Sequence, residues 1–455
     1  MFKDLRPYPE YHNPAGSWLA AAPAHWGQVR FRNVLRERDR RSVTGSEQLL
    51  RVSQYTGVTE RRARGDQADT RASSLVGYKL VDTGDLAVNI MLAWNGSLGV
   101  SPCQGIVSPA YCVYRFRESV RPWYFHYLLR SPTYAARIKA LSTGVVDSRL
   151  RLYTEGLYGL EALVPPADEQ AAIVKYLAHA HRRIDRAIAA KRKLIALLDE
   201  QKQAIVATHL RQGEASVRGV RLKFVASLQT GLTLGKAYQD GSTGEYSYLR
   251  VANVQAGSLD LRQVTKVAVP PQEAARCTLR KGDVLMTEGG DIDKLGRATL
   301  WRGEIDACLH QNHIFAVRCG PDLDPDFLVL ALSEGSARYY FAITSKKTTN
   351  LASTNSTTVR SFRFPCPPLH EQRAMAARIT AETATADAAI DRARREIELL
   401  REFRTRLTSD VVTGQLDVRH IAATLPDLDP DDLAANVGGE GDDLDDEVAE
   451  ITEDA

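Results

Sequence analysis

The sequence predicts an α+β protein in which two strand-rich globular domains, in a pseudo-two-fold arrangement, are separated by two long antiparallel coiled-coil helices. Three observations support this fold class. The chain has 455 residues, more than most single domains contain. A sequence unit occurs twice at a separation of 202 positions, and each copy continues into a long, charged heptad pattern. The segments before the two copies alternate apolar residues with glycine and aspartate turns, as strands and hairpins do.

The repeated unit opens with the motif Pro-Pro-x-x-Glu-Gln, which reads VPPADEQ at 164–170 and CPPLHEQ at 366–372. Because proline suits the position before a helix and not its interior, each motif predicts a helix start. The glutamate of each copy then lies in the first turn, where the helix dipole favours a carboxylate. We expect helices over about 168–210 and 370–412.

Downstream of each motif, residues recur at alternating steps of four and three, which is the heptad seam of a coiled coil. Polar residues interrupt both seams, so each helix alone is weak and pairing between the two copies is the economical arrangement. The predicted helix-pairing residues are Leu177, Ile184, Ile188, Ile195, Leu198, Ile205, Ile379, Ile390, Ile397, Leu400 and Leu407.

These elements divide the chain into five predicted parts. A first globular domain (1–163) precedes the first helical unit (164–213), and a second globular domain (214–364) precedes the second helical unit (365–418). The last part (419–455) is acidic and poor in large apolar residues, so we expect it to be disordered.

The two globular domains resemble each other less than the helices do. This contrast predicts two similar scaffolds that carry different surfaces. The matching segments are VRFRNVL (29–35) with VRLKFVA (220–226), GDLAVNIMLAWNGSLG (84–99) with GDVLMTEGGDIDKLG (282–296), and CVYR (112–115) with FAVR (315–318).

The net charge of +3 conceals an asymmetry. Of the 56 Asp and Glu residues, 13 lie between Asp427 and Asp454, where there is no Lys or Arg. The rest of the chain therefore carries 59 basic and 43 acidic residues, a net charge of +16. This balance favours an anionic partner, nucleic acid first, although a solvated basic surface is the ordinary alternative. Competition of the acidic tail with DNA for that surface is a hypothesis that deleting residues 427–455 would test.

Cysteine spacing and hydropathy indicate the cellular compartment in which the protein works. The six cysteines form no Cys-x-x-Cys pair, which suits a reducing cytoplasm better than a disulfide framework or a zinc site. The N-terminus lacks the apolar core of a signal peptide, and there is no run of about 18 apolar residues. We expect a cytoplasmic protein without a membrane partner.

Both helical units, with the domains before them, resemble the specificity (S) subunit of type I restriction–modification systems. The resemblance covers about residues 15–418, and its most specific sign is the pair of Pro-Pro-x-x-Glu-Gln motifs with their heptads. The second seam is more polar than is usual in the family, and the acidic tail is extra. Further signs are PAHW (23–26), GSLGVSPCQGIVSPAY (96–111), YSYLRVANVQAGSLDL (246–261) and LRKGDVLMTEGGDIDKLGRA (279–298).

The resemblance implies that each globular domain is a target-recognition domain for one half of a bipartite, gapped sequence in double-stranded DNA. It implies that the helices form a spacer and bind modification (adenine methyltransferase) subunits, with two as the expected number, to which restriction/motor subunits are added. This chain would direct adenine methylation and restriction in phage defence without being an enzyme itself. S-adenosylmethionine, ATP and Mg²⁺ would be bound by the partner subunits, and no cofactor by this chain.

Motifs for catalysis within this chain are weak. GLTLGKA (231–237) is one residue shorter than a phosphate-binding loop and ends in Ala237, where Mg²⁺ binding needs Ser or Thr. There is no Asn/Asp-Pro-Pro-aromatic tetrad to hold a flipped adenine. HQNH (310–313) offers two histidines without an evident third metal ligand, so we predict no metal site. The alternatives are a coiled-coil scaffold that never reads DNA, or a nuclease or methyltransferase in its own right.

Candidate DNA-binding residues lie in polar, basic loops. Arg recognises guanine, and Asn or Gln recognises adenine, through paired hydrogen bonds in the major groove, whereas other cations contact phosphates. Loops 142–151 and 344–356 hold equivalent places in the repeat. Base contacts are predicted from Asn95, Arg149, Arg250, Asn253, Arg297, Gln311, Asn312 and Asn350. Phosphate contacts are predicted from Arg61, Arg62, Arg64, Lys294, Lys346 and Lys347. For Arg250 and Asn253 a structural role is the open alternative.

Overall fold

The chain divides into two compact units in a computed structural model. Unit 1 comprises Met1–Arg192 and Arg394–Ala455, and unit 2 comprises Lys193–Ala393. No helix among the described residues is long and apolar enough to cross a bilayer. The structure describes residues 5–14, 18–19, 21–61, 74–118, 120–146, 149–214, 219–235, 243–290, 295–347 and 352–429.

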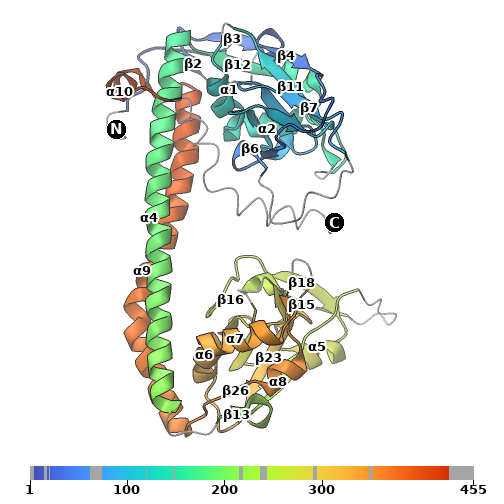
Figure 1. Cartoon of the computed structure of the whole chain (residues 1–455), viewed down its shortest axis with the longest axis vertical. Helices are drawn as coiled ribbons and strands as arrows, with labels where there is room; N and C mark the ends of the chain where they lie inside the picture. The colour runs from blue at the N-terminus through green and yellow to red at the C-terminus, as the bar shows by residue number, and fades with distance from the viewer. Residues whose placement is uncertain are drawn as a thin grey trace. The chain divides into compact units, whose positions relative to one another are not determined.

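Two long helices confirm the helical prediction. Helix α4 spans Ala167–Glu214 and α9 spans Leu369–Val412, each starting just after the Pro-Pro pair of its motif (Figure 1). The division between the units falls within both helices, so each unit contains a part of each.

The two helices run antiparallel in each unit. In unit 1, Arg404 Nη1 donates to Asp185 Oδ1 at 2.8 Å. In the same unit His181 Nε2 lies 2.8 Å from Thr408 Oγ1. In unit 2, Lys202 Nζ donates to Asp387 Oδ1, and His209 Nε2 lies 2.9 Å from Glu382 Oε2. In each unit, residue numbers therefore rise along α4 as they fall along α9. The predicted helix-pairing residues are all shielded from solvent. Leu177, Ile184, Ile188, Ile379, Ile390, Ile397 and Leu407 are buried, and Ile195, Leu198, Ile205 and Leu400 are half-buried.

A four-stranded antiparallel sheet occurs in both units with one topology. In each unit the spatial order of the strands is first, fourth, second and third in chain order. The unit 1 sheet contains β4 (Leu35–Arg38), β11 (Tyr111–Phe116), β8 (Leu86–Asn89) and β9 (Leu98–Val100). The unit 2 sheet contains β14 (Ala226–Thr230), β23 (Ile314–Cys319), β19 (Asp283–Thr287) and β21 (Ala298–Leu300).

The elements around each sheet are also duplicated. A two-stranded ladder joins the start and the end of each globular domain, and two short helices follow the fourth strand. In unit 1 these are β3 (Gly27–Arg30), β12 (Glu161–Val164), α1 (Pro122–Leu129) and α2 (Pro132–Leu141). In unit 2 they are β13 (Val220–Arg221), β26 (Arg363–Phe364), α6 (Pro325–Ser333) and α7 (Gly335–Thr344). The predicted α+β class and the internal repeat are confirmed, whereas the five-part division of the chain stays a prediction.

Smaller elements complete the two units. In unit 1 they are β1 (Tyr11–His12), β2 (Ala22–Pro23), β5 (Leu50–Ser53), β6 (Gly57–Glu60), β7 (Lys79–Val81), β10 (Gly105–Val107), α3 (Thr154–Gly159) and α10 (Arg419–Thr424). In unit 2 they are β15 (Gly244–Leu249), β16 (Val254–Gln255), β17 (Ser258–Leu259), β18 (Thr265–Val269), β20 (Gly289–Gly290), β22 (Leu309–His310), β24 (Lys346–Lys347), β25 (Ala352–Ser353), α5 (Pro271–Cys277) and α8 (Ser356–Ser361).

The glutamine of each repeated motif ties a long helix to its globular domain. Gln170 is buried, and its Oε1 accepts a hydrogen bond from Arg121 N at 2.9 Å. Gln372 is buried likewise, and its Oε1 accepts from Asp324 N at 2.8 Å. Each Nε2 also donates to the carbonyl of the motif's first proline. Because Arg121 and Asp324 directly precede α1 and α6, the motif is a structural clamp in both copies.

The glutamates of the two motifs differ, which the sequence did not predict. Glu169 is 3% exposed and accepts hydrogen bonds from Tyr8 Oη at 2.5 Å and Trp26 Nε1 at 3.0 Å. Burial and this carboxylate together raise the pKa of Tyr8. Glu371 is exposed on α9. The first copy therefore also anchors the N-terminal segment.

The two globular domains share a buried aspartate that pairs with arginine. The aspartate follows the glycine at the start of the matching segments 84–99 and 282–296, and the arginine ends the matching segments 112–115 and 315–318. In unit 2, Asp283 is 1% exposed and accepts from Arg318 Nε at 2.8 Å and Nη2 at 2.7 Å. This hydrogen-bonded carboxylate raises the pKa of Arg318. In unit 1, Asp85 is shared between Arg38 Nη1 at 2.9 Å and Arg115 Nε at 3.4 Å. The equivalent aspartate is thus bound by one arginine in unit 2 and by two arginines in unit 1.

Buried histidines predict acid sensitivity. Burial lowers the pKa of His126 and of His181, both in unit 1, well below 6.5. At a pH between the pKa values of a histidine in the folded and in the unfolded chain, the unfolded chain binds a proton that the folded chain does not. The stabilisation is therefore complete above about pH 6.5 and is lost as the pH falls. From pH 7 to 5.5 we expect a loss of about 1 kcal/mol in the free energy of unfolding per histidine, measured by urea titration. A free energy of unfolding that does not change over this pH range would contradict the prediction.

Candidate nucleic-acid interface

In unit 2 the strands bring two predicted reading loops side by side. Parallel pairing of Leu249 with His310 places the residues after β15 next to those after β22. Gln311 N donates to Leu249 O at 2.9 Å, and Gln311 Oε1 accepts from Val251 N at 3.2 Å. Loops that lie far apart in the sequence therefore meet at one edge.

Backbone bonds add two further loops to this edge. Glu288 N donates to His313 O at 2.9 Å, and Thr354 N donates to Glu288 O at 2.8 Å. Strand β25 pairs with β20 on one side and with β24 on the other, which brings Lys346 opposite Ser353. We call the resulting surface the unit 2 edge. It is defined by Arg250, Arg297, Gln311, Asn312 and Lys346.

The members of the unit 2 edge differ in accessibility. Arg250 and Lys346 are exposed, and Arg297, Gln311 and Asn312 are half-buried. Arg297 Nη1 donates to Gln255 Oε1 at 3.3 Å, which holds its guanidinium near the loop after Arg250. The edge thus offers three cations together with two amide side chains, the groups that phosphate and base recognition require.

Asn253 is a structural residue. It is 5% exposed, its Nδ2 donates to Asp260 O at 2.8 Å and Gln263 O at 2.9 Å, and its Oδ1 accepts from Arg250 N at 2.8 Å. An amide that already makes these three bonds has little capacity left for adenine. The structural alternative for Asn253 therefore holds, and we no longer propose it as a base contact. Lys294, Asn350 and the Lys347 side chain lie outside the described residues.

In unit 1 an equivalent hairpin carries one of the predicted base contacts. Thr143 and Arg151 exchange backbone hydrogen bonds of 2.9 Å, and Leu152 N donates to Ile90 O at 2.9 Å. This last bond matches the bond from Thr354 to Glu288 in unit 2, which supports the equivalence of the two loops. Arg149 is exposed on this hairpin.

The other unit 1 candidates are dispersed. Asn95 is half-buried, and its Oδ1 accepts from Ser97 Oγ at 2.9 Å. Arg61 is exposed at the end of β6. Arg62 and Arg64 lie outside the described residues.

Two features of unit 1 are not predicted by the pattern of polar loop residues. Val145 and Val146, on the Thr143–Arg151 hairpin, are 98% and 51% exposed. The only sequence signal for them is a Val-Val pair within a polar loop.

Arg130 is the other feature. It holds two loops together by donating to the carbonyls of Ser53, Gln54, Tyr55, Gly96 and Leu98.

The histidines of HQNH do not form a metal site. His310 is fully buried, and its Nδ1 lies 2.9 Å from Ile314 O, which marks it as a core residue. Burial lowers its pKa to about 4. Across the part of the chain that the structure describes, there is no group of three or more His, Cys, Asp and Glu that could hold a metal ion. The GLTLGKA segment lies partly outside the described residues.

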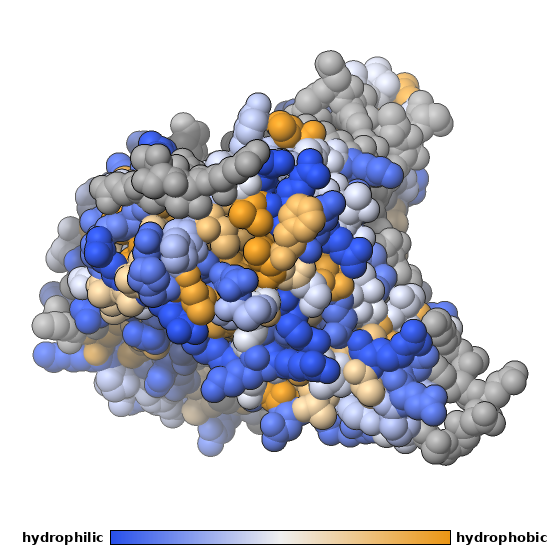
Figure 2. All heavy atoms as spheres, turned by 90° about the horizontal axis from the view of Figure 1, so that it is seen from below, coloured by the Kyte–Doolittle hydropathy of each residue, from blue (hydrophilic) through white to orange (hydrophobic). Residues whose placement is uncertain are grey.

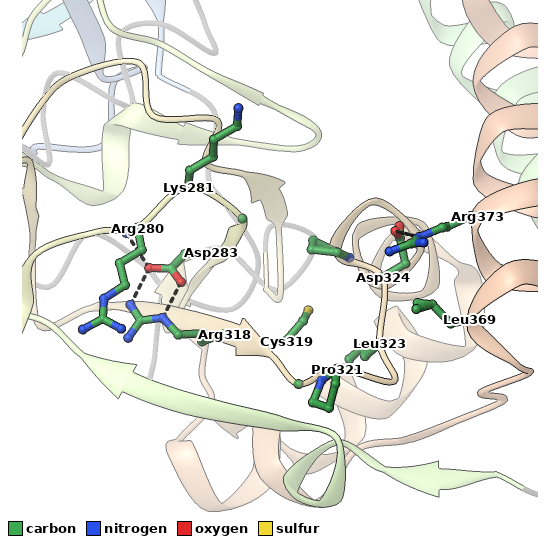
Figure 3. A pocket seen from close by; sticks show the side chains of 13 residues that line it. Arg280, Lys281, Asp283, Arg318, Cys319, Pro321, Leu323, Asp324, Leu369 and Arg373 are labelled. Carbon is green, nitrogen blue, oxygen red and sulfur yellow. Dashed lines mark hydrogen bonds and ion pairs between the residues drawn. The ribbon is translucent and has the colours of Figure 1, made fainter.

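A cleft of about 360 Å³ in unit 2 is lined by four cations, two of which are paired with carboxylates. Figure 3 shows Arg318 facing Asp283, and Arg373 facing Asp324. These two ion pairs neutralise half of the four lining cations, and Arg280 and Lys281 leave the cleft with a net positive charge. Figure 2 shows polar and charged side chains over most of the face seen there, with small apolar areas between them.

Comparisons with known proteins find similarity to the specificity subunits of type I restriction enzymes. The type I restriction enzyme StySPI specificity subunit of Salmonella potsdam is 23% identical over 290 residues, and the EcoKI specificity subunit of Escherichia coli is 22% identical over 290 residues. Each match covers 61% of this chain, and the chain spans 62% of the length of these curated relatives. No known family model matches the chain.

A solved structure supports the fold independently. It comes from work on complex assembly and conformational transition of the type I restriction–modification system, and it covers 87% of this chain and 99% of its own chain. The TM-score is 0.56 at 17% identity, which shows a shared fold. The predicted resemblance is confirmed.

Proposed function

We propose that this chain, a relative of the specificity subunits of type I restriction–modification systems, is the DNA-reading subunit of such a complex. Each globular domain would read one half of a bipartite, gapped target in double-stranded DNA. The chain would direct adenine methylation and restriction by its partners in the cytoplasm, with no catalytic centre or cofactor of its own. S-adenosylmethionine, ATP and Mg²⁺ would be bound by those partners.

The observation that carries this proposal is the duplication of one scaffold with two different surfaces. The sheets, ladders, short helices and glutamine clamps of the two units correspond, whereas the edges differ in residue type. Lys346 of unit 2 and Arg149 of unit 1 lie on equivalent hairpins that an anionic duplex would attract. A scaffold without DNA reading would not need exposed cations on two equivalent hairpins of otherwise unlike sequence.

The partner proposal is supported by a repeated apolar position on the long helices. Leu197 of α4 is 54% exposed, and Leu399, its counterpart on α9, is 63% exposed. They are related by the same 202-residue step as the two motifs. Large apolar side chains exposed at equivalent positions suit two copies of one partner, as expected for two modification subunits.

The test is a methylation map. The full chain, produced with its methyltransferase partner in cells lacking other such systems, should yield methylated adenines within a single gapped, two-part motif. Cells producing the methyltransferase without this chain are the control and should show no such motif. Methylation independent of this chain, or absent with it, would refute the proposal.

Charge removal on the unit 2 edge provides a further prediction. Lys346→Ala combined with Lys347→Ala should weaken binding to cognate and random duplexes alike, because phosphate contacts carry no sequence information. The slope of log affinity against log salt concentration should flatten by ~0.9 for each phosphate that the variant no longer neutralises. Lys281→Ala is the matched control, because it precedes β19 and so lies at the opposite end of that strand from β20. A weakening confined to the cognate sequence would instead assign these lysines to base reading.

A further inference from the structure

We propose that the apolar tip of the Thr143–Arg151 hairpin reads the C5-methyl group of a thymine in the half-site recognised by unit 1. The proposal rests on the proposed function and adds a specificity-determining contact to it. Val145 is the principal residue, and Val146 supports it.

The hairpin holds these side chains out in solvent. Val145 is 98% exposed, the highest value among the large apolar residues of the part of the chain that the structure describes. The hairpin is closed by two backbone bonds of 2.9 Å between Thr143 and Arg151, and Arg149 N donates to Val146 O at 2.9 Å. Two adjacent exposed valines, flanked by these hydrogen bonds, indicate a surface that is completed by a partner.

The position of the hairpin in the repeat favours DNA as that partner. Its counterpart in unit 2 is the Lys346–Ser353 pairing on the unit 2 edge. On the unit 1 hairpin the apolar tip lies close in sequence to the exposed Arg149, and α2, which leads into the hairpin, places Lys139 Nζ 5.0 Å from the centre of the Trp94 ring. Arg149, whose main-chain N–H donates to Val146, puts a cation beside the apolar tip, as suits a duplex groove where phosphates flank the bases.

The chemistry of the major groove supplies one apolar group. The thymine methyl is the feature that small apolar side chains contact there, and it distinguishes an A·T pair from a G·C pair. A valine tip on the Thr143–Arg151 hairpin can therefore add sequence information that Arg149 and Asn95 do not supply.

The test replaces each thymine of the unit 1 half-site in turn with deoxyuridine, which keeps the hydrogen-bonding groups and lacks only the methyl. The half-site is taken from the methylation map, and binding is measured with the full chain in complex with its methyltransferase. We expect a loss of about fourfold in affinity at one position, as for one buried methyl group. Val145→Ala, alone or with Val146→Ala, should bind the thymine and uracil versions of that position equally.

The control is Val43→Ala, because Val43 is 85% exposed and lies outside the hairpin. It should keep the full sensitivity to uracil. Absence of any uracil effect in the native protein would overturn the inference while leaving a mapped half-site, and therefore the proposed function, intact. A variant that retains the uracil effect but loses methyltransferase binding would also overturn it, by assigning the valines to that subunit. Absence of a mapped motif would overturn both proposals.

Discussion

Replacing Arg318 with alanine is expected to lower the free energy of unfolding of unit 2 by about 3–5 kcal/mol. The mutation removes both hydrogen bonds from the guanidinium to Asp283, whose side chain is 1% exposed. The carboxylate would then stay buried beside the backbone N–H of Arg280, which donates to it at 2.8 Å. Leaving one charge buried without a partner destabilises a protein by more than the intact pair stabilises it. The expected decrease in the free energy of unfolding therefore exceeds that for a surface ion pair.

The repeat supplies a matched comparison. Arg115→Ala in unit 1 should cost less than about 1 kcal/mol, because Arg115 is 53% exposed and Arg38 still pairs with Asp85. Arg280→Ala should be nearly neutral, since its bond to Asp283 comes from the main chain. Urea unfolding followed by circular dichroism would measure all three variants. Equal losses for Arg318→Ala and Arg115→Ala would show that the buried pair is not the cause.

The repeated helices could be predicted because their signals are local. Proline before a helix and a heptad seam act within a few residues of each position, so the predicted boundaries of α4 and α9 agree with the structure to within a few residues. The role of the motif's glutamine could not be predicted in the same way. Its partners, Arg121 and Asp324, lie about fifty residues away along the chain and meet it only in the folded domain.

The candidate interface shows the same limit more strongly. By residue type, Asn253 and Gln311 were equally good candidates for base contacts. Only the fold shows that the Asn253 amide is buried with three backbone partners, whereas Gln311 is half-buried at the unit 2 edge. The valines of the unit 1 hairpin could not be predicted in this way, because hydrogen-bonding capacity does not identify residues that make apolar contacts with DNA. Surface position, not composition, separates a reading residue from a structural one.

Exchange of the second globular domain should change one half of the DNA target and leave the other half unaltered. The prediction rests on the proposed function. Replacing residues 214–364 with the corresponding part of a relative exchanges the whole unit 2 edge. The junctions are suitable because β13 and β26, at the two ends of the block, pair with each other, so a single ladder is transferred intact.

The expected methylation map then contains the original half-site of unit 1 joined to a new half-site. The distance between the two should be unchanged, because residues 167–213 of α4 and the whole of α9 are retained. The reciprocal exchange of residues 1–163 is the control, and it should alter the other half. Each domain carries its own hydrophobic core and its own candidate DNA-binding hairpin, so the two contributions to target choice should be independent. A changed sequence in both halves after one exchange would mean that the two domains read the target jointly.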